Sequence, residues 1–225
     1  NDRYSSGVTD FTTAQLNRMP LFPLPSVVFF PHTLLPLHVF EPRYQEMVQY
    51  CLANDWPVCV PCIRPGHEGE QLASPPMCNI AGAGFIRRHE ALPDGRFNIV
   101  LGGIRRVRVL QELKGVETFR VAEVEVVEEP PGDPTELSRE IELMRACLTR
   151  LAQSVPTVGK VVMAQAHQAQ DPAQLADRIA ALIFHGPRTR QAMLECAEVD
   201  ERVRRVTRRL STLITGTLGE GEAVH

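Results

Sequence analysis

Apolar residues dominate one stretch near the start of the chain, from Met19 to Tyr44, but prolines interrupt it throughout. The six prolines of this stretch are Pro20, Pro23, Pro25, Pro31, Pro36 and Pro42. Each proline fixes φ and lacks a backbone donor, so the stretch cannot form a continuous helix, either in a core or across a membrane. The pattern predicts two extended segments instead, at 27–30 and 34–40, with prolines at strand ends or edges.

The hydrophobic pattern then continues as short apolar segments between turns. Pro42 suits the first turn of a helix, and apolar residues recur on one helical face at 43–52. Strands are predicted at 58–63, 78–89, 96–101, 104–110 and 118–127. Gly82 and Gly84 indicate a bend or a close backbone approach, and the turn residues at 92–95 indicate a hairpin. Short strands, regular turns and a single helix predict a small β-barrel.

From residue 133 onward, apolar residues recur every three or four positions, which is the spacing of amphipathic helices. Asp133, Pro134 and Glu136 suit the start of the first helix, at 133–155. Further helices are predicted at 158–168, 171–185, 188–196 and 199–215. The predicted fold class is therefore α+β. The predicted organisation is a flexible extension at 1–18, a β-barrel domain at 19–130, a helical bundle at 133–215 and a flexible tail at 216–225.

Two segments of this pattern, PLFPLPSVVFFPHTLLPLHVFEPRY and LPDGRFNIVLGGIRRVRVL, resemble the amino-terminal substrate-recognition domain of the Lon protease family. That domain also occurs in free-standing Lon-domain proteins and in cereblon. The resemblance continues more loosely through the helical part, from about Met19 to about Leu213 in total. It implies a PUA-like pseudo-barrel followed by a helical extension.

The resemblance also rests on six residues to which we assign structural roles: Glu41, Pro42, Arg43, Tyr44, Asp94 and Gly95. Glu41 is expected to stabilise the helix amino terminus electrostatically. Arg43 is expected to anchor a neighbouring loop. Proline and glycine in the Asp94-Gly95 turn set the backbone angles that a hairpin needs.

Composition excludes few classes of protein. The 225 residues are 44% hydrophobic and 23% charged, as in an ordinary soluble domain, and the net charge of −3 attracts neither nucleic acid nor membrane. The chain shows neither a signal peptide at its start nor an uninterrupted apolar segment long enough for a membrane span, so a cytoplasmic location is predicted. Six cysteines in a chain of this length are expected to be reduced thiols.

Lon proteases depend for their activity on an ATPase module and a serine–lysine protease module, and the resemblance reaches neither. The sequence has no GxxxxGK[ST] motif, since Gly159-Lys160 is followed by Val161. Lys114 and Lys160 are its two lysines, which leaves few candidates for a serine–lysine dyad. We therefore predict that the chain is not an enzyme and needs no cofactor.

The sequence offers two alternatives, a zinc site and an RNA-binding module. Cys59 and Cys62 form a CxxC pair, and Cys78 is a third thiol for zinc, but a second CxxC or an HxxxH is missing. Small buried hydrophobes in a strand are the simpler interpretation of these cysteines. The arginine clusters at 87–88, 105–108 and 202–209 raise the alternative of an RNA-binding PUA-like module, but few aromatic residues lie near them for base stacking.

The leading hypothesis is a non-catalytic module that binds unfolded or partly folded polypeptides, or adapts them to a protease or chaperone in protein quality control. Such binding needs exposed apolar surface. The apolar corner around Pro31 is the candidate, with Phe29, Phe30, His32, Leu34 and Leu35 as the predicted peptide-binding residues. Nucleic acid and membrane are not expected as partners.

Overall fold

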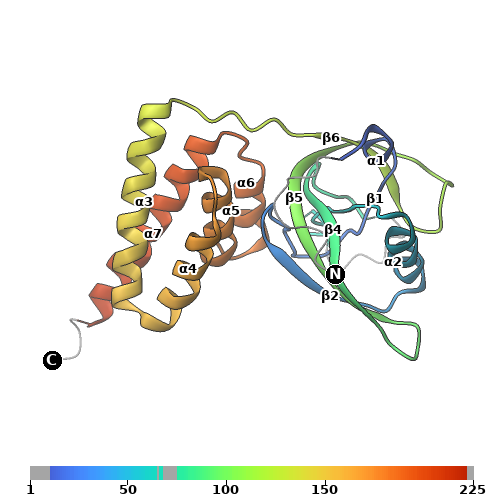
Figure 1. Ribbon diagram of the computed structural model, residues 1–225, viewed down its shortest axis with the longest axis horizontal. Coiled ribbons are helices and arrows are strands. Elements are labelled where there is room, and N and C mark those ends of the chain that lie inside the picture. The colour runs from blue at the N-terminus through green and yellow to red at the C-terminus, as the bar shows by residue number, and fades with distance from the viewer. Residues whose placement is uncertain (1–10, 65, 68–74, 222–225) are drawn as a thin grey trace. The chain divides into compact units, whose positions relative to one another are not determined.

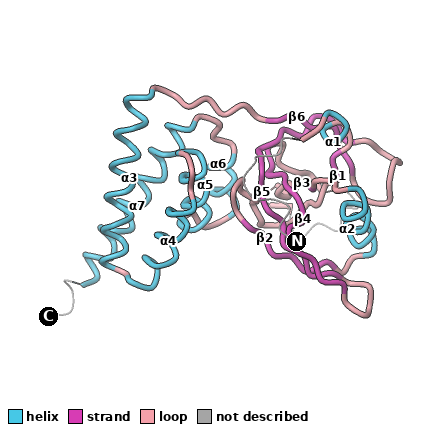
Figure 2. Tube along the Cα trace, in the orientation of Figure 1, coloured by secondary structure: helices cyan, strands magenta, loops and turns pink. Residues whose placement is uncertain are grey.

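The structure of the chain is a computed structural model and describes residues 11–64, 66–67 and 75–221. The chain divides into two compact units, Asn1–Val127 and Glu128–His225, which we call the sheet unit and the helical unit. The sheet unit carries all the described strands and the helical unit carries helices, so the fold class is α+β, as predicted (Figures 1 and 2). Across the described ranges, no helix is long and apolar enough to cross a membrane.

The sheet unit is built on one antiparallel sheet. Its elements are α1 (Thr13–Leu16), β1 (Met19–Pro20), β2 (Leu34–Val39), α2 (Pro42–Asn54), β3 (Val58–Val60), β4 (Ile80–Ala91), β5 (Phe97–Glu112) and β6 (Val121–Val126). The strand order is β1-β6-β5-β4-β3, and β2 pairs separately with β5. The first part of β5 lies between β4 and β2, whereas its last part pairs with β6. The long β4–β5 hairpin is the curved ribbon of Figure 1.

The segment at 19–24 closes this sheet into a pseudo-barrel. β1 pairs with β6 at one edge, where Pro20 lies opposite Val121. A few residues later the same segment reaches the other edge, where the N–H of Phe22 donates to the carbonyl of Cys59 at 2.8 Å. Its prolines are tolerated because they lie in short strands and bridges rather than within a long ladder.

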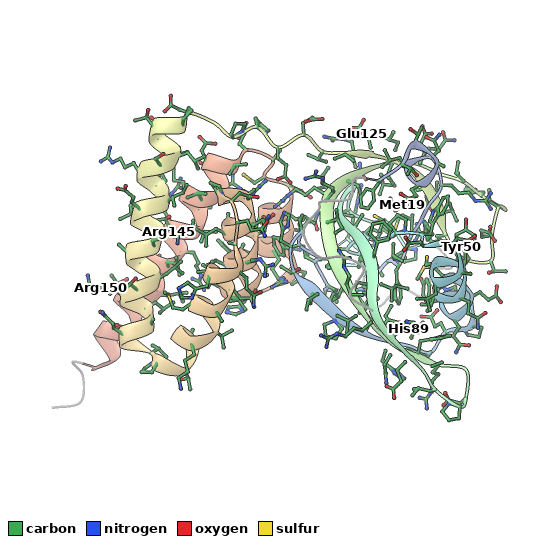
Figure 3. All side chains as sticks on the ribbon, in the orientation of Figure 1. Met19, Tyr50, His89, Glu125, Arg145 and Arg150 are labelled. Carbon is green, nitrogen blue, oxygen red and sulfur yellow. The ribbon has the colours of Figure 1, made fainter. Side chains whose placement is uncertain are left out.

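Two apolar clusters fill the sheet unit. One is formed by α2 and the facing residues of β2, β3 and β5, and the other lies between β1, β4 and β6. α2 contributes the stripe expected from its sequence, with Tyr44, Met47, Val48 and Cys51 buried. Met19 and Tyr50 mark the two clusters in Figure 3, Met19 within one and Tyr50 at the margin of the other.

The sheet unit departs from the prediction in three places. Residues 28–30 are buried and Val27 is half-buried, but this segment forms no regular strand. Gly102 and Gly103 do not divide β5, which runs without a break from Phe97 to Glu112. Residues 11–18 are not a flexible extension, because Phe11 is buried and Thr12 caps α1 by accepting from the N–H of Gln15; residues 1–10 of the predicted extension lie outside the described part.

The helical unit contains α3 (Pro134–Ser154), α4 (Pro156–Gln168), α5 (Pro172–Ile183), α6 (Pro187–Leu194) and α7 (Val199–Gly221). A proline occupies the first turn of each of the helices α3 to α6, where no N–H partner is lost. Asp133 and Asp171 cap α3 and α5 by accepting hydrogen bonds from backbone N–H groups. α7 continues beyond the predicted limit at 215 to Gly221, which corrects that part of the flexible-tail prediction.

Arg202 on α7 belongs to the arginine cluster at 202–209, and it is completely buried. Its Nη2 lies 2.9 Å from Glu129 and its Nε 3.5 Å from the buried Asp177. Its Nη1 donates to the carbonyls of Cys196 and Ala197 at 3.1 and 2.8 Å. The guanidinium therefore ties the start of this unit, α5 and the loop before α7 together. Burial is tolerable because the charge is paired and hydrogen bonded.

Candidate functional site

The predicted peptide-binding residues fall into different environments. Phe29 and Phe30 are each 1% exposed, so they belong to the core and not to an exposed apolar surface. Their backbone lies directly on the sheet: a Cβ at Gly82 would come within 2.0 Å of the Phe29 carbonyl oxygen, and one at Gly103 within 2.3 Å of that of Phe30. The sheet glycines allow this close approach, and the approach buries both rings.

Leu34 is at the opposite extreme and is 68% exposed. Leu35 is half-buried and packs against the core cluster next to α2. His32 is a turn residue with a φ of 60°, and its N–H donates to the carbonyl of Gly103 at 3.0 Å. The binding role of these residues remains a prediction, and the exposed apolar surface is concentrated at Leu34.

Leu34 belongs to a face of the sheet that three strands build together. Pro36 of β2 lies opposite Val100 of β5, which in turn lies opposite Arg88 of β4. Side chains at paired positions share one face of a sheet. We call this the outer face; its side chains are Leu34, Pro36, His38, Arg88, Glu90, Asn98 and Val100. A groove of about 470 Å³ runs along these strands, and His89 marks this part of β4 in Figure 3.

A chain of polar contacts crosses the outer face near the hairpin turn. The Nδ2 of Asn98 donates to Glu90 at 2.9 Å, and its Oδ1 lies 2.8 Å from the Nδ1 of His38. With this amide orientation His38 carries its proton on Nδ1, and its Nε2 faces the Nη1 of Arg96 at 3.4 Å. Arg96 is in turn paired with Asp94, which accepts from its Nε at 2.6 Å. The polar groups at this end of the groove are thus occupied with one another.

Phe40 lies just beyond β2 and is 62% exposed. Its ring stacks beside that of His38 with centroids 6.3 Å apart, and its carbonyl accepts from Gln45 Nε2 at 2.9 Å. Leu34 and Phe40 therefore mark the two ends of β2, about 20 Å apart for six extended residues. Exposed apolar residues at both ends of one strand are suited to contacting an elongated apolar partner.

Four of the family-motif residues, at 41–44, lie at the start of α2, outside the chain of polar contacts just described. Glu41 is the N-cap residue of α2, but its side chain makes no cap hydrogen bond and instead accepts from Arg43 at 2.9 Å. Arg43 also lies over the Tyr44 ring, 4.6 Å from its centroid, and not against a neighbouring loop. Tyr44 packs on Phe22 in the core, and this burial raises its pKa. Glu41, Pro42, Arg43 and Tyr44 thus hold the first turn of α2 against the barrel.

The Asp94-Gly95 turn joins β4 to β5. Gly95 has a φ of 84°, in the left-handed region that favours glycine, and its N–H donates to the carbonyl of Leu92 at 3.0 Å. Hydrogen bonds from Arg96 lower the pKa of the Asp94 carboxyl. The turn fixes the register that places Asn98 opposite Glu90 and so assembles the polar chain.

The CxxC cysteines are in the interior. Cys59 is completely buried among apolar side chains of β1 and β4, and burial raises the pKa of its thiol. Cys62 is also buried, and Cys78 is half-buried. Among the residues that the structure describes, no group of three or more His, Cys, Asp or Glu side chains is arranged to hold a metal ion.

The arginine clusters are largely engaged with carboxylates or with the sheet. Arg106 is fully buried, and Arg108 pairs with Glu125 at 2.8 Å. On α7, Arg204 and Arg205 both contact Glu201, at 2.6 and 2.8 Å. Such pairing neutralises much of the positive charge that phosphate binding would use, so no observation here favours RNA.

Sequence reasoning missed most of the outer face. Pro36, His38 and Phe40 share one side of the extended segment after Leu34, and the period of two was the signal that could have found them. Asn98 and Glu90 follow from the Asp94-Gly95 turn once its register is counted. The pairing of β2 with β5 could not be predicted in this way, because the two strands are far apart in the sequence.

The fold is that of solved Lon amino-terminal domains. The chain is similar to a Lon N-terminal domain protein from Xanthomonas campestris, with a TM-score of 0.57 and 23% identity over 84% of this chain and 96% of that one. It is also similar to the N-terminal domain of a Mycobacterium avium complex Lon protease, with a TM-score of 0.65 and 17% identity over 87% of this chain and 98% of that one. Both likenesses cover the sheet and helices together.

Sequence comparison identifies the family. Residues 18–212 match the ATP-dependent protease La (LON) substrate-binding domain, and the chain belongs to this family. Relatives include the Lon proteases of Dictyoglomus thermophilum, 26% identical over 84% of this chain, and of Escherichia coli, 26% identical over 82%. The match covers 24% and 23% of those two proteins, so the chain spans about a quarter of the length of the relatives it matches.

Proposed function

We propose that this chain is a non-catalytic module that recognises unfolded or partly folded polypeptides and presents them to a protease or chaperone. Membership of the Lon substrate-binding family supports the recognition of polypeptide substrates. Protein quality control is the setting that this activity would serve. The location we propose is cytoplasmic.

The observation that carries the proposal is the exposure of β2: a groove lies along Pro36 and His38, and Leu34 and Phe40, at the two ends of the strand, are more than half exposed. Burying one such side chain against a partner is worth about 1.5–3 kcal/mol. Unfolded chains differ in sequence but share exposed apolar side chains, so an apolar groove with satisfied polar groups suits many of them.

The proposal assigns no chemistry to these residues. The 225 residues contain no GxxxxGK[ST] motif, and the outer face places His38 in hydrogen bonds with Asn98 and Arg96 rather than beside a serine or cysteine nucleophile. Peptide-bond hydrolysis, where it follows recognition, is proposed to occur at a separate catalytic module.

Fluorescence anisotropy with labelled, reduced and alkylated α-lactalbumin, which stays unfolded, tests the proposal. The double variant Leu34→Ser/Phe40→Ser is expected to bind at least about tenfold more weakly, equivalent to about 1.4 kcal/mol. Leu110→Ser is the matched control, because Leu110 is 50% exposed on β5 but lies in the part of that strand that does not pair with β2; we expect its affinity to stay near that of the wild type. Absence of binding by the folded wild-type chain at tens of micromolar would contradict the proposal.

A further inference from the structure

β2 is hydrogen bonded on one side only within the described part of the chain, where it pairs with β5 alone. The orientation of its backbone follows from two observations. The N–H of Gly103 donates to the carbonyl of Thr33 at 2.9 Å, so the backbone groups of Thr33 point toward β5. In an antiparallel pair, successive residues point their backbone groups to opposite sides. The backbone groups of the alternate residues Leu35, Leu37 and Val39 therefore point toward β5.

The opposite end of β5 gives the same alternation. The N–H of Leu92 donates to the carbonyl of Arg96 at 2.8 Å, which makes these residues a hydrogen-bonded pair between β4 and β5. Counting along the register, Asn98 and Val100 then face β4, and Ile99 and Leu101 face β2. The two ends of the ladder agree.

The backbone groups of Leu34, Pro36 and His38 consequently point away from β5, and we call them the free edge of β2. The edge offers a donor and an acceptor at Leu34 and again at His38, but only an acceptor at Pro36, which has no N–H. The complement of such an edge is another extended backbone. The two complete positions are four residues apart, about 13 Å along a strand.

Side chains along the free edge are apolar on both faces of the sheet. Leu34 and Pro36 lie on the outer face, while Leu35 and Leu37 are half-buried on the opposite face. A strand laid beside β2 would place alternate side chains against each pair. The polar chain from His38 to Glu90 is internally satisfied, so it does not compete for the backbone of a guest.

We propose that the free edge of β2 binds an extended, apolar segment of an unfolded polypeptide as an added strand. This inference rests on the proposed function and specifies how the substrate is read: through its backbone, and therefore with little dependence on sequence. Because Pro36 has no N–H, the middle of the edge lacks one donor. Pairing is therefore weaker, and the bound segment can dissociate. The missing donor also makes pairing between two copies of the edge less favourable.

Backbone methylation of a peptide tests strand addition without changing its side chains. The parent is a fluorescein-labelled ten-residue peptide with apolar residues at alternate positions, and two isomers carry N-methyl groups on alternate residues of one register or the other. The isomer methylated on the residues that face β2 is expected to bind at least about tenfold more weakly than the other isomer, because its backbone can no longer donate to the three edge carbonyls of Leu34, Pro36 and His38. Equal affinities of the two isomers would overturn the inference.

The variant Pro36→Val tests the same edge from the side of the protein. It adds an N–H that points away from β5, so the fold keeps its hydrogen bonds and the parent peptide is expected to bind about fivefold more tightly. Pro93→Val is the matched control, since Pro93 is an exposed proline in the hairpin turn; it should leave affinity unchanged. Wild-type affinity in Pro36→Val would also overturn the inference.

The outcomes separate the two proposals. Binding of unfolded α-lactalbumin together with equal affinities of the methylated isomers would remove strand addition and leave the proposed function standing. Failure of both α-lactalbumin and the parent peptide to bind would remove both. A wild-type dimer in sedimentation velocity that Pro36→Val strengthens, with peptide affinity unchanged, would assign the edge to a second copy of the chain and overturn the inference.

Discussion

The completely buried Arg202 of the helical unit lies close to two carboxylates, those of Glu129 and Asp177. The sheet unit also buries one arginine, Arg106, but it leaves Leu34 and Phe40 more than half exposed. The helical unit also exposes Leu143 and Val161, but on helices whose backbone groups are already paired along the helix. Only a sheet can combine exposed apolar side chains with an open row of backbone donors and acceptors. The difference indicates that a buried ion cluster stabilises the helical unit, and that the surface we propose for polypeptide recognition lies on the sheet unit.

The largest expected effect comes from breaking the ion cluster of the helical unit. Arg202→Met removes the charge that pairs with Asp177 and Glu129, and should destabilise this unit by about 3–5 kcal/mol. Urea unfolding followed by far-ultraviolet circular dichroism, which reports mainly on helices, should shift to lower urea. Fluorescence of Trp56, the single tryptophan, reports on the sheet unit and should shift less.

Arg208→Met is the control for this change, because the Arg208 side chain is 65% exposed on the same helix. Its effect should stay below about 1 kcal/mol, as for an exposed ion pair. Equal unfolding curves of Arg202→Met and Arg208→Met would show that the buried cluster contributes nothing, and the contrast between the units would lose its basis.

The converse change targets the sheet unit. Gly82→Ala would place a Cβ 2.0 Å from the Phe29 carbonyl oxygen, and the forced backbone shift should cost about 2–3 kcal/mol. Here the Trp56 transition should move more than the helical one. Gly216→Ala in α7 is the control, since no atom lies within 4 Å of its Cβ and alanine favours a helix by up to about 1 kcal/mol. A Gly82→Ala chain as stable as the wild type would contradict the close approach of residues 29–30.

Buried thiols should give the sheet unit an alkaline sensitivity. Burial raises the pKa of Cys51 to about 12, above the value of about 8.5 for a free thiol. Below about pH 8.5 both states are protonated and stability is complete; above it only the unfolded chain releases the proton, so stability falls by up to about 1.4 kcal/mol per pH unit. Trp56 unfolding curves between about pH 8 and 10 should show a shallower fall in Cys51→Ala than in the wild type.

Cys147→Ala is the control for that experiment, because it removes a half-buried thiol of the helical unit. Because Trp56 reports on the sheet unit, the Trp56 unfolding curves of Cys147→Ala should follow those of the wild type at each pH. If Cys51→Ala and the wild type fall with the same slope, the Cys51 thiol is not the group responsible.

The smallest effect is expected at the exposed turn of the sheet unit. Arg96 lowers the pKa of Asp94, so the contribution of this carboxylate is present above its ordinary pKa and is lost as the pH falls through the lowered value. Asp94→Asn should therefore lower the thermal midpoint slightly at neutral pH and not at all below that pH range. A difference between Asp94→Asn and the wild type that persists in strong acid would point to a role for Asp94 other than its charge.

The helices were largely predictable, because their signals are local. Asp133 and Asp171 with the prolines that follow them mark helix starts, and the apolar spacing continues to the helix ends. The exception is Arg202. Its burial depends on Asp177 and Glu129, which lie outside α7 and do not enter the apolar spacing of that helix. The apolar spacing predicts which face of a helix is buried. It does not predict which charged side chain becomes buried against other parts of the unit.

The strands were predictable as extended segments, but their exposure was not. Phe30 and Leu34 are both apolar residues within three positions of Pro31, and nothing in their local sequence distinguishes an exposed position from a buried one. The distinction arises because Gly82 and Gly103, far along the chain, leave space for the backbone of residues 29–30. The same long-range packing explains why residues 11–18 are ordered, since Phe11 packs against Phe85 with ring centroids 5.8 Å apart.

By itself, the sequence determined the fold class, the boundaries of most helices, the Asp94-Gly95 turn and the family, since propensity, capping and motif spacing act over a few residues. The tertiary structure alone decided which side of the proline-rich stretch is buried and that β2, among the described residues, pairs with β5 along one edge only. Both depend on backbone contacts between segments distant in the chain, where space and hydrogen-bond partners are set by the whole sheet.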